Sequence, residues 1–163
     1  MTEIVAGSPA PEFRVPAVTR QGEHEIALSD YRGKSVVLYF YPKDDTPGCT
    51  TEACSFRDQL QDFEAVGGVI LGISPDDPKS HAKFAEKFAL PFPLLADPDH
   101  AVAEAYGVWK ERTNYGKTYM GIERTTFVID KDGNIAKVFP KVKVDQHSEK
   151  VLEFVKSLGG SSE

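Results

Sequence analysis

The run Ser35-Val36-Val37-Leu38-Tyr39-Phe40-Tyr41 is apolar at every position after its first serine. A strand of this kind has both faces covered, as in the middle of a sheet that helices flank. The polar loop 42–48 follows, and apolar residues then recur at steps of three and four, which is typical of an amphipathic helix. These apolar positions are Ala53, Phe56, Leu60, Phe63 and Val66. A buried strand, a loop and a helix in this order predict the start of a β-α-β unit.

Further strands are predicted on both sides of this unit. Residues 69–73 form a second apolar run, which predicts the parallel partner strand. Residues 13–18 and 25–28 flank a turn and predict an N-terminal β-hairpin. Residues 125–129 and 135–139 flank a turn rich in Asp and Gly and predict a second antiparallel pair.

The remaining helices are predicted between and after these strands. Residues 80–88, 99–106 and 148–158 carry helical spacing, and Gly159-Gly160 should close the last helix. The order of elements predicts an α/β fold, a thioredoxin-like three-layer sandwich with a central mixed sheet flanked by helices and an N-terminal β-hairpin.

Length and charge limit the possible functions. The chain has 163 residues, which predicts a single domain over residues 1–163 with a frayed tail at about 159–163. It has 19 Lys and Arg against 25 Asp and Glu, a net charge of −6, and no basic run, which argues against nucleic acid and anionic membranes as partners. The longest apolar run is too short to span a bilayer, and the N-terminus lacks a signal-peptide pattern. We therefore expect a cytoplasmic protein.

The metal-ligating residue types are sparse. Two cysteines, Cys49 and Cys54, are too few for a four-cysteine zinc site. The four histidines are scattered along the chain, so we expect surface side chains rather than metal ligands; they are His24, His81, His100 and His147. Because a dinucleotide fingerprint and a phosphate loop are also lacking, we expect no cofactor and no metal.

Cys49 lies where the predicted helix begins. Thr46 is a good N-cap residue, and Pro47 suits the first helical position. Cys49 then falls in the first turn, where backbone N–H groups are unpaired and the helix dipole is positive. Such a site stabilises a thiolate, which is the nucleophilic form of cysteine.

A helix terminus alone is too weak to activate a thiol fully. Moving a cysteine from its ordinary pKa of about 8.5 to about 6 takes roughly 3.4 kcal/mol, whereas a helix terminus supplies at most about 2 kcal/mol. A cation is therefore expected near Cys49. Lys43 is the local candidate and Arg124, at the mouth of a later strand, is the distant one. Arginine suits the task better, because its planar fork can contact two atoms and never loses its charge.

The same segment resembles a known family. Pro42-x-x-x-Thr46-x-x-Cys49 is similar to the peroxiredoxin active-site motif, and residues 39–54 resemble the bacterioferritin comigratory protein, or peroxiredoxin Q, class. The resemblance covers nearly the whole chain, including Gly7-Ser8-Pro9-Ala10-Pro11-Glu12-Phe13, residues 28–34, Gly72-Ile73-Ser74 and residues 123–130.

The resemblance implies a role for each motif residue. Cys49 would attack hydrogen peroxide or an alkyl hydroperoxide and become a sulfenic acid. Thr46 would hydrogen-bond the thiolate and the peroxide, and Pro42 would shape the loop and shield the sulfenic acid. Arg124 would supply the second electrostatic contact. Cys54 would resolve the sulfenic acid as an intramolecular disulfide, which a dithiol such as thioredoxin would reopen.

Two further expectations concern Glu52 and the assembly. By the same resemblance, Glu52 is a weaker candidate for orienting Arg124. Peroxiredoxins that resolve across a dimer carry a cysteine in the C-terminal arm, and no cysteine follows Cys54, so we expect a monomer.

Other interpretations stay open at this point. Thr46 could serve only as a cap, Pro42 only as a turn residue, Arg124 only as a surface residue, and Cys54 could be inert. A thioredoxin-like disulfide reductase is an alternative function, although Thr46 occupies the first position of the C-x-x-C spacing that ends at Cys49. A chaperone or sensor that peroxide activates is a second alternative.

Overall fold

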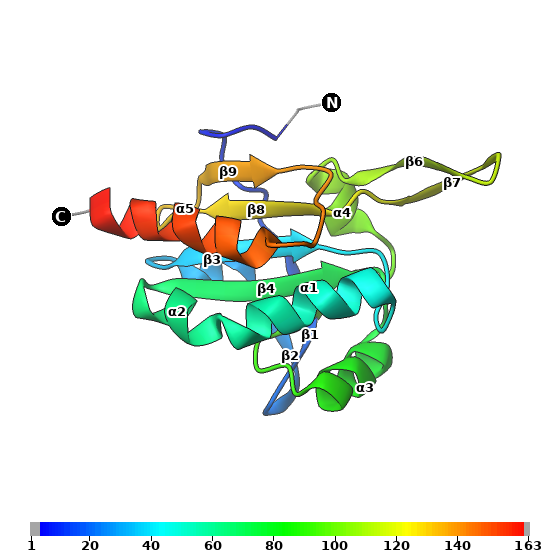
Figure 1. Cartoon of the computed structure of the whole chain (residues 1–163), viewed down its shortest axis with the longest axis horizontal. Coiled ribbons are helices and arrows are strands. Elements are labelled where there is room, and N and C mark those ends of the chain that lie inside the picture. The colour runs from blue at the N-terminus through cyan, green and yellow to red at the C-terminus, as the bar shows by residue number, and fades with distance from the viewer. Residues whose placement is uncertain (1–3, 162–163) are drawn as a thin grey trace.

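The computed structural model describes residues 4–161 and is built around a seven-stranded sheet (Figure 1). The strand order is β2-β1-β5-β4-β3-β8-β9. Their bounds are β1 Arg14–Thr19, β2 Gly22–Ala27, β3 Ser35–Phe40, β4 Gly68–Ser74, β5 Leu94–Ala96, β8 Thr125–Ile129 and β9 Ile135–Phe139. β3, β4 and β5 run parallel, and the other pairs are antiparallel, so the sheet is mixed as predicted.

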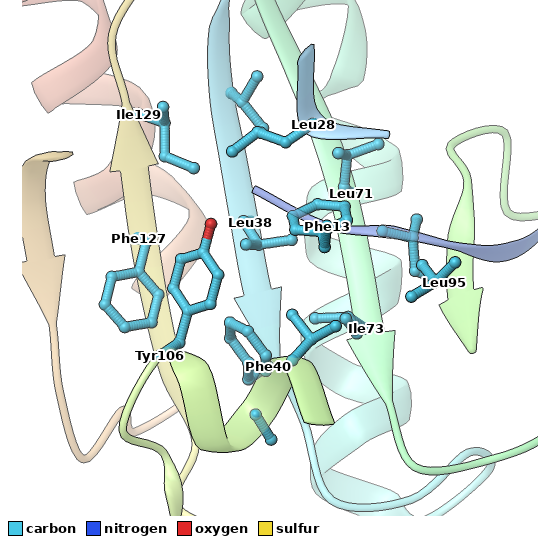
Figure 2. Packing of buried hydrophobic residues seen from close by; sticks show 14 of the residues in the cluster. Phe13, Leu28, Leu38, Phe40, Leu71, Ile73, Leu95, Tyr106, Phe127 and Ile129 are labelled. Atoms are coloured by element: carbon cyan, nitrogen blue, oxygen red, sulfur yellow. The ribbon is translucent and has the colours of Figure 1, made fainter. Parts of the chain in front are cut away.

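The central strand β3 feeds two cores because its side chains alternate between the two faces of the sheet. Val36, Leu38 and Phe40 enter the core on one face. Figure 2 shows Leu38 and Phe40 there, beside Phe127 and Tyr106. The apolar run that predicted this strand therefore reports burial on both sides, as in a three-layer sandwich.

The opposite core, which receives Tyr39 and Tyr41, lies under most of the helices. These are α1 Pro47–Asp58, α2 Leu60–Ala65, α3 Pro78–Phe88 and α5 His147–Ser161. The other face carries the short helices η1 Leu28–Tyr31 and α4 Ala101–Ala105. No helix in the part of the chain that the structure describes combines the length and apolar character needed to cross a bilayer.

Two helix predictions need correction. The apolar pattern from Ala53 to Val66 suggested one helix, but the backbone at Gln59 departs from helical geometry and separates α1 from α2. Periodicity reports which side chains are buried and does not report a local change in hydrogen bonding. The last helix continues through Gly159-Gly160 to Ser161, because glycine weakens a helix without ending it unless the backbone turns left-handed. The end of the predicted tail, residues 162–163, lies outside the described residues.

The sequence reasoning missed three strands. β5 is only three residues long. β6 Trp109–Asn114 and β7 Lys117–Ile122 form a hairpin that projects from the body (Figure 1). Most of its side chains are exposed, so no apolar run marks it. Its signal is the turn Tyr115-Gly116, where both residues have positive φ, as a two-residue hairpin turn requires.

Candidate active site

Cys49 lies at the start of α1, just beyond the carboxyl end of β3. Thr46 precedes the helix with extended backbone, and Pro47 is the first helical residue. The first helical hydrogen bond runs from the N–H of Thr50 to the carbonyl of Thr46. The Cys49 side chain is buried at 1% exposure in the first turn, as the sequence predicts.

Arg124 brings a cation to this thiol from the junction of β7 and β8. Its Nη2 lies 3.2 Å from Cys49 Sγ, and its Nη1 donates to Glu52 Oε1 at 2.6 Å. Burial lowers the pKa of Arg124, but Glu52 and Cys49 outweigh this effect and hold the pKa above its ordinary value. Lys43, the local candidate, is exposed, so Arg124 is the cation that contacts the thiol.

Gly48 makes room for this arginine. A Cβ atom added at Gly48 would lie 3.2 Å from Arg124 Nη2, which is closer than most real Cβ contacts. Gly48 was not predicted as a site residue from the sequence, although its place directly before Cys49 was the available signal. A larger residue there would require the guanidinium to shift by a few tenths of an ångström.

Thr46 and Pro42 occupy the loop before the helix. Thr46 occupies the predicted N-cap position, but its hydroxyl donates to the carbonyl of Lys43 at 3.0 Å and makes no capping hydrogen bond. A hydrogen bond to a thiolate or peroxide would need this hydroxyl to rotate. Pro42 is exposed and lines, together with Arg124 and Arg112, an open cavity of about 490 Å³. The cavity provides a route from solvent to the guanidinium.

Glu52 is almost completely buried behind Arg124, at 1% exposure. Its Oε2 has no hydrogen-bond partner among the described residues and lies 4.0 Å from His147 Nε2. Burial raises the pKa of Glu52 to about 7, although Arg124 acts in the opposite direction. Glu52 therefore holds Arg124 most firmly in its ionised form, above neutral pH.

His147 is the first residue of α5 and lies next to Glu52, on the side away from Arg124. Its Nε2 lies 2.8 Å from Thr126 Oγ1 on β8. Burial, followed by Lys150 and Arg124, lowers the pKa of His147 to about 4, so the ring is neutral near pH 7. The expectation that all histidines lie on the surface is wrong for His147 and for His81, which are 5% and 0% exposed. Scattered spacing in sequence carries no information about contacts made across the fold.

Cys54 lies in the same helix as Cys49, and both thiols are free. Cys54 is part-exposed, whereas Cys49 is buried. Arg57 lies one turn further along and donates through Nη1 to the carbonyl of Phe88 at 2.7 Å. The hydrogen bond to Asp58 raises the pKa of Arg57, and the nearby Cys54 adds to the effect. The second half of α1 is thereby held to the end of α3.

The shifted pKa values of Glu52 and His147 predict opposing effects on stability. Between pH 4.5 and 7 the folded protein keeps a proton on Glu52 that the unfolded chain has lost, so stability falls as pH rises. Between pH 4 and 6.5 only the unfolded chain protonates His147, so stability rises with pH. His147→Asn should remove the second effect. As the pH rises from about 4.5 to 6.5, the unfolding free energy of this variant should fall by about 2 kcal/mol relative to that of the unchanged protein. Urea unfolding at several pH values measures both.

The exposed His24 provides the control for this measurement. His24→Asn should leave the pH dependence of the unfolding free energy as it is, because this side chain lies on the surface of β2. Parallel stability curves for His147→Asn and the unchanged protein would contradict the assignment.

Comparisons with known proteins agree with this geometry. Residues 6–138 match the model of the AhpC/TSA family. The chain is 52% identical over 157 residues to peroxiredoxin Bcp of Bacillus subtilis, covering 95% of this chain and 97% of that protein. It is 46% identical over 156 residues to peroxiredoxin Bcp of Escherichia coli, covering 96% and 98% of the two chains.

Solved structures give the same result. Peroxiredoxin Q of Xanthomonas campestris superposes with a TM-score of 0.87 at 39% identity, covering 97% of this chain and 99% of that chain. The bacterioferritin comigratory protein of the same organism, studied for its alkyl peroxide reduction activity, superposes with a TM-score of 0.87 at 38% identity, covering 96% and 99%. The thioredoxin-like fold and the family expected from the motif are both confirmed. The chain therefore belongs to the AhpC/TSA family and, within it, to the peroxiredoxins of the Bcp and peroxiredoxin Q type.

Proposed function

We propose that this peroxiredoxin reduces hydrogen peroxide and organic hydroperoxides through the thiolate of Cys49. Membership of the family makes the chain a thiol-dependent peroxidase that acts on peroxides. The observation that carries the assignment of the nucleophile is the 3.2 Å contact between Arg124 Nη2 and Cys49 Sγ at the start of a helix. The guanidinium and the helix terminus both favour negative charge on the sulfur.

The first step transfers one oxygen atom from the peroxide to the sulfur. The thiolate of Cys49 attacks one peroxide oxygen, and the O–O bond breaks as the S–O bond forms. The sulfur is oxidised to a sulfenic acid, and the leaving oxygen takes a proton and departs as water or an alcohol. Negative charge moves from sulfur to the leaving oxygen during this step, and the guanidinium of Arg124, 3.2 Å from the sulfur, lies close enough to stabilise it.

Cys54 then resolves the sulfenic acid. Its thiolate attacks the Cys49 sulfur, hydroxide leaves as water after taking a proton, and an intramolecular disulfide forms. A dithiol such as thioredoxin reduces this disulfide and restores both thiols. We further propose that the protein acts as a monomer, because both cysteines lie in one chain and one helix, and that it works in the cytoplasm, where reduced dithiols are available.

The disulfide requires α1 to open. Residues five apart in an α-helix have Cα atoms about 8.7 Å apart and side chains on different sides, whereas a disulfide spans at most about 7 Å. Cys49 and Cys54 both lie within the continuous helix Pro47–Asp58. Because helix ends open at low free-energy cost, the first turns of α1 provide the movement.

The division of labour between the two cysteines is the direct test of this function. Cys49→Ser should abolish peroxide consumption. Cys54→Ser should retain one fast turnover and then stall or over-oxidise, because no partner resolves the sulfenic acid. Stopped-flow peroxide assays with and without thioredoxin measure both. Ser55→Ala, next to Cys54 on the same helix, is the control and should turn over normally; full turnover by Cys54→Ser would contradict its resolving role.

Arg124→Met should slow peroxide attack by roughly 10² to 10³-fold, as for one lost charged donor in an active site. The thiolate fraction of Cys49 at pH 7, followed by ultraviolet absorbance, should fall as well. Arg14→Met removes an exposed arginine that pairs with Glu25 on the N-terminal hairpin, and both quantities should stay unchanged in it. Equal rates for the two variants would transfer the role to another cation.

Oxidation should remove protection from amide exchange in the first turns of α1 and leave β3 and β4 protected. The expected change spans residues 49–54, with more of the helix following if the opening spreads. Amide exchange of the dithiol and disulfide forms measures it, and Cys54→Ser treated with peroxide is the control because it cannot close the bond. A disulfide form that keeps residues 49–54 helical would rule out the opening.

A further inference from the structure

A second buried polar cluster holds the loop before Cys49 from the side of α3. Asp44 is 7% exposed, and both of its carboxylate oxygens are hydrogen-bonded. Oδ1 accepts from the hydroxyl of Tyr41 at 2.6 Å. Oδ2 accepts from the hydroxyl of Ser80 at 2.8 Å and lies 2.7 Å from Nδ1 of His81. The reaction described above uses none of these groups.

The contacts of His81 show where its protons lie. The ring is fully buried, and Nε2 lies 2.8 Å from the carbonyl oxygen of Leu95. A carbonyl can only accept, so Nε2 carries a proton. The contact between Nδ1 and Asp44 Oδ2 then holds another proton, and the two side chains form a hydrogen-bonded pair whose net charge is zero. Removing one partner of such a buried pair is strongly destabilising, because the other partner is left buried and unpaired. The pair therefore fixes the position of Asp44 relative to α3.

The backbone of Asp44 is held as well. Its N–H donates to Oδ2 of Asp76 at 2.7 Å, and the same oxygen accepts from the hydroxyl of Ser74 at 2.7 Å. The carboxylates of Asp44 and Asp76 and the ring of His81 offer ligand atoms within 4.8 Å of one another. Asp44 and His81 instead contact each other directly at 2.7 Å, and Asp76 accepts from the Asp44 N–H and the Ser74 hydroxyl. The cluster is therefore a tether for the loop.

The tether ends directly before a strained residue. Asp45 has φ of 59°, in the left-handed region that costs a non-glycine residue about 1 kcal/mol or more. Thr46 and the first turn of α1 follow at once. A strained link between a firmly held residue and a helix start relaxes when either side is released. The loop is thus held in its present form by contacts with α3 and with Asp76 after β4, in addition to its internal hydrogen bond from Thr46 to Lys43.

We propose that Asp44 and His81 are positioning residues that hold the loop 42–46 in its peroxide-reactive form and oppose the opening of α1. The inference rests on the proposed function, because it assumes that Cys49 is first oxidised and then joined to Cys54. The tether favours the first step by keeping Thr46 and Pro42 beside Cys49. It slows the second step, because the opening that brings Cys54 to Cys49 must displace the loop that the tether holds.

The test separates the two steps. In His81→Asn, a rapid pulse of hydrogen peroxide should oxidise Cys49 roughly tenfold more slowly, as expected for losing a hydrogen bond to a charged group. The subsequent disulfide should form faster, and less sulfinic acid should accumulate at high peroxide. Quenched samples with alkylated thiols and a trapped sulfenic acid, analysed by mass spectrometry, give both rates. Ser80→Ala removes one weaker contact and should shift both rates in the same directions by a smaller factor.

The controls distinguish positioning from general stability. His100→Asn removes a part-exposed histidine that pairs with Glu104 at 2.9 Å and stacks on Trp109, away from the Asp44 cluster, and both rates should stay as they are. Slowing of both steps in parallel with a loss of thermal stability would overturn the proposal and leave the pair as a structural element. So would unchanged rates in folded His81→Asn and Ser80→Ala. If the unchanged protein itself forms no Cys49–Cys54 disulfide, the proposed function fails first.

Discussion

The guanidinium of Arg124 contacts two groups from α1, the thiol of Cys49 and the carboxylate of Glu52. This contact constrains much of the surrounding structure. A part-buried arginine needs negative partners on its inward-facing donors, because an uncompensated charge in the interior costs several kcal/mol. Glu52 supplies one partner, which is fully ionised only above neutral pH, and Cys49 supplies the other. Gly48 gives the guanidinium room to lie against the helix.

The same contact explains why a carboxylate with a raised pKa is tolerated in the core. Glu52 is buried against Arg124, and its second oxygen has no hydrogen-bond partner among the described residues. The free energy lost by burying it is offset in part by Arg124, and the neutral ring of His147 beyond it adds no competing charge near pH 7. Cys49 and Glu52 both lie on α1, so the proposed opening of this helix would separate both from Arg124 at once.

Two polar systems therefore act on the segment around Cys49 from opposite sides. Arg124 reaches it from the β7–β8 junction, and Asp44 ties its loop to His81 on α3. Arg57 fixes the far half of α1 to the end of α3. Between these attachments lies the stretch that contains both cysteines. A segment that is held at its ends and reactive in its middle can open locally while the sheet stays intact.

Local patterns in the sequence were enough to predict the central strand, the helix start and the position of Cys49, because each depends on residues only a few positions away in sequence. The buried run 36–41 and the Thr46-Pro47 pair carry that information directly. The break at Gln59 and the continuation of α5 to Ser161 were not predictable in this way, since small free-energy differences between backbone states decide them.

The contacts that make the site work depend on the tertiary structure. Arg124 is 75 residues from Cys49 in sequence, and His81 is 37 residues from Asp44, so no local pattern relates them. The sequence offered both Arg124 and Lys43 as the cation near Cys49. Only the tertiary structure shows that Arg124 contacts the thiol and that Lys43 is exposed. Buried His81 and His147 looked like scattered surface residues, because burial is set by how strands and helices pack. The local sequence determines where a nucleophilic cysteine can lie, and the fold determines which charged residues, distant in sequence, contact it.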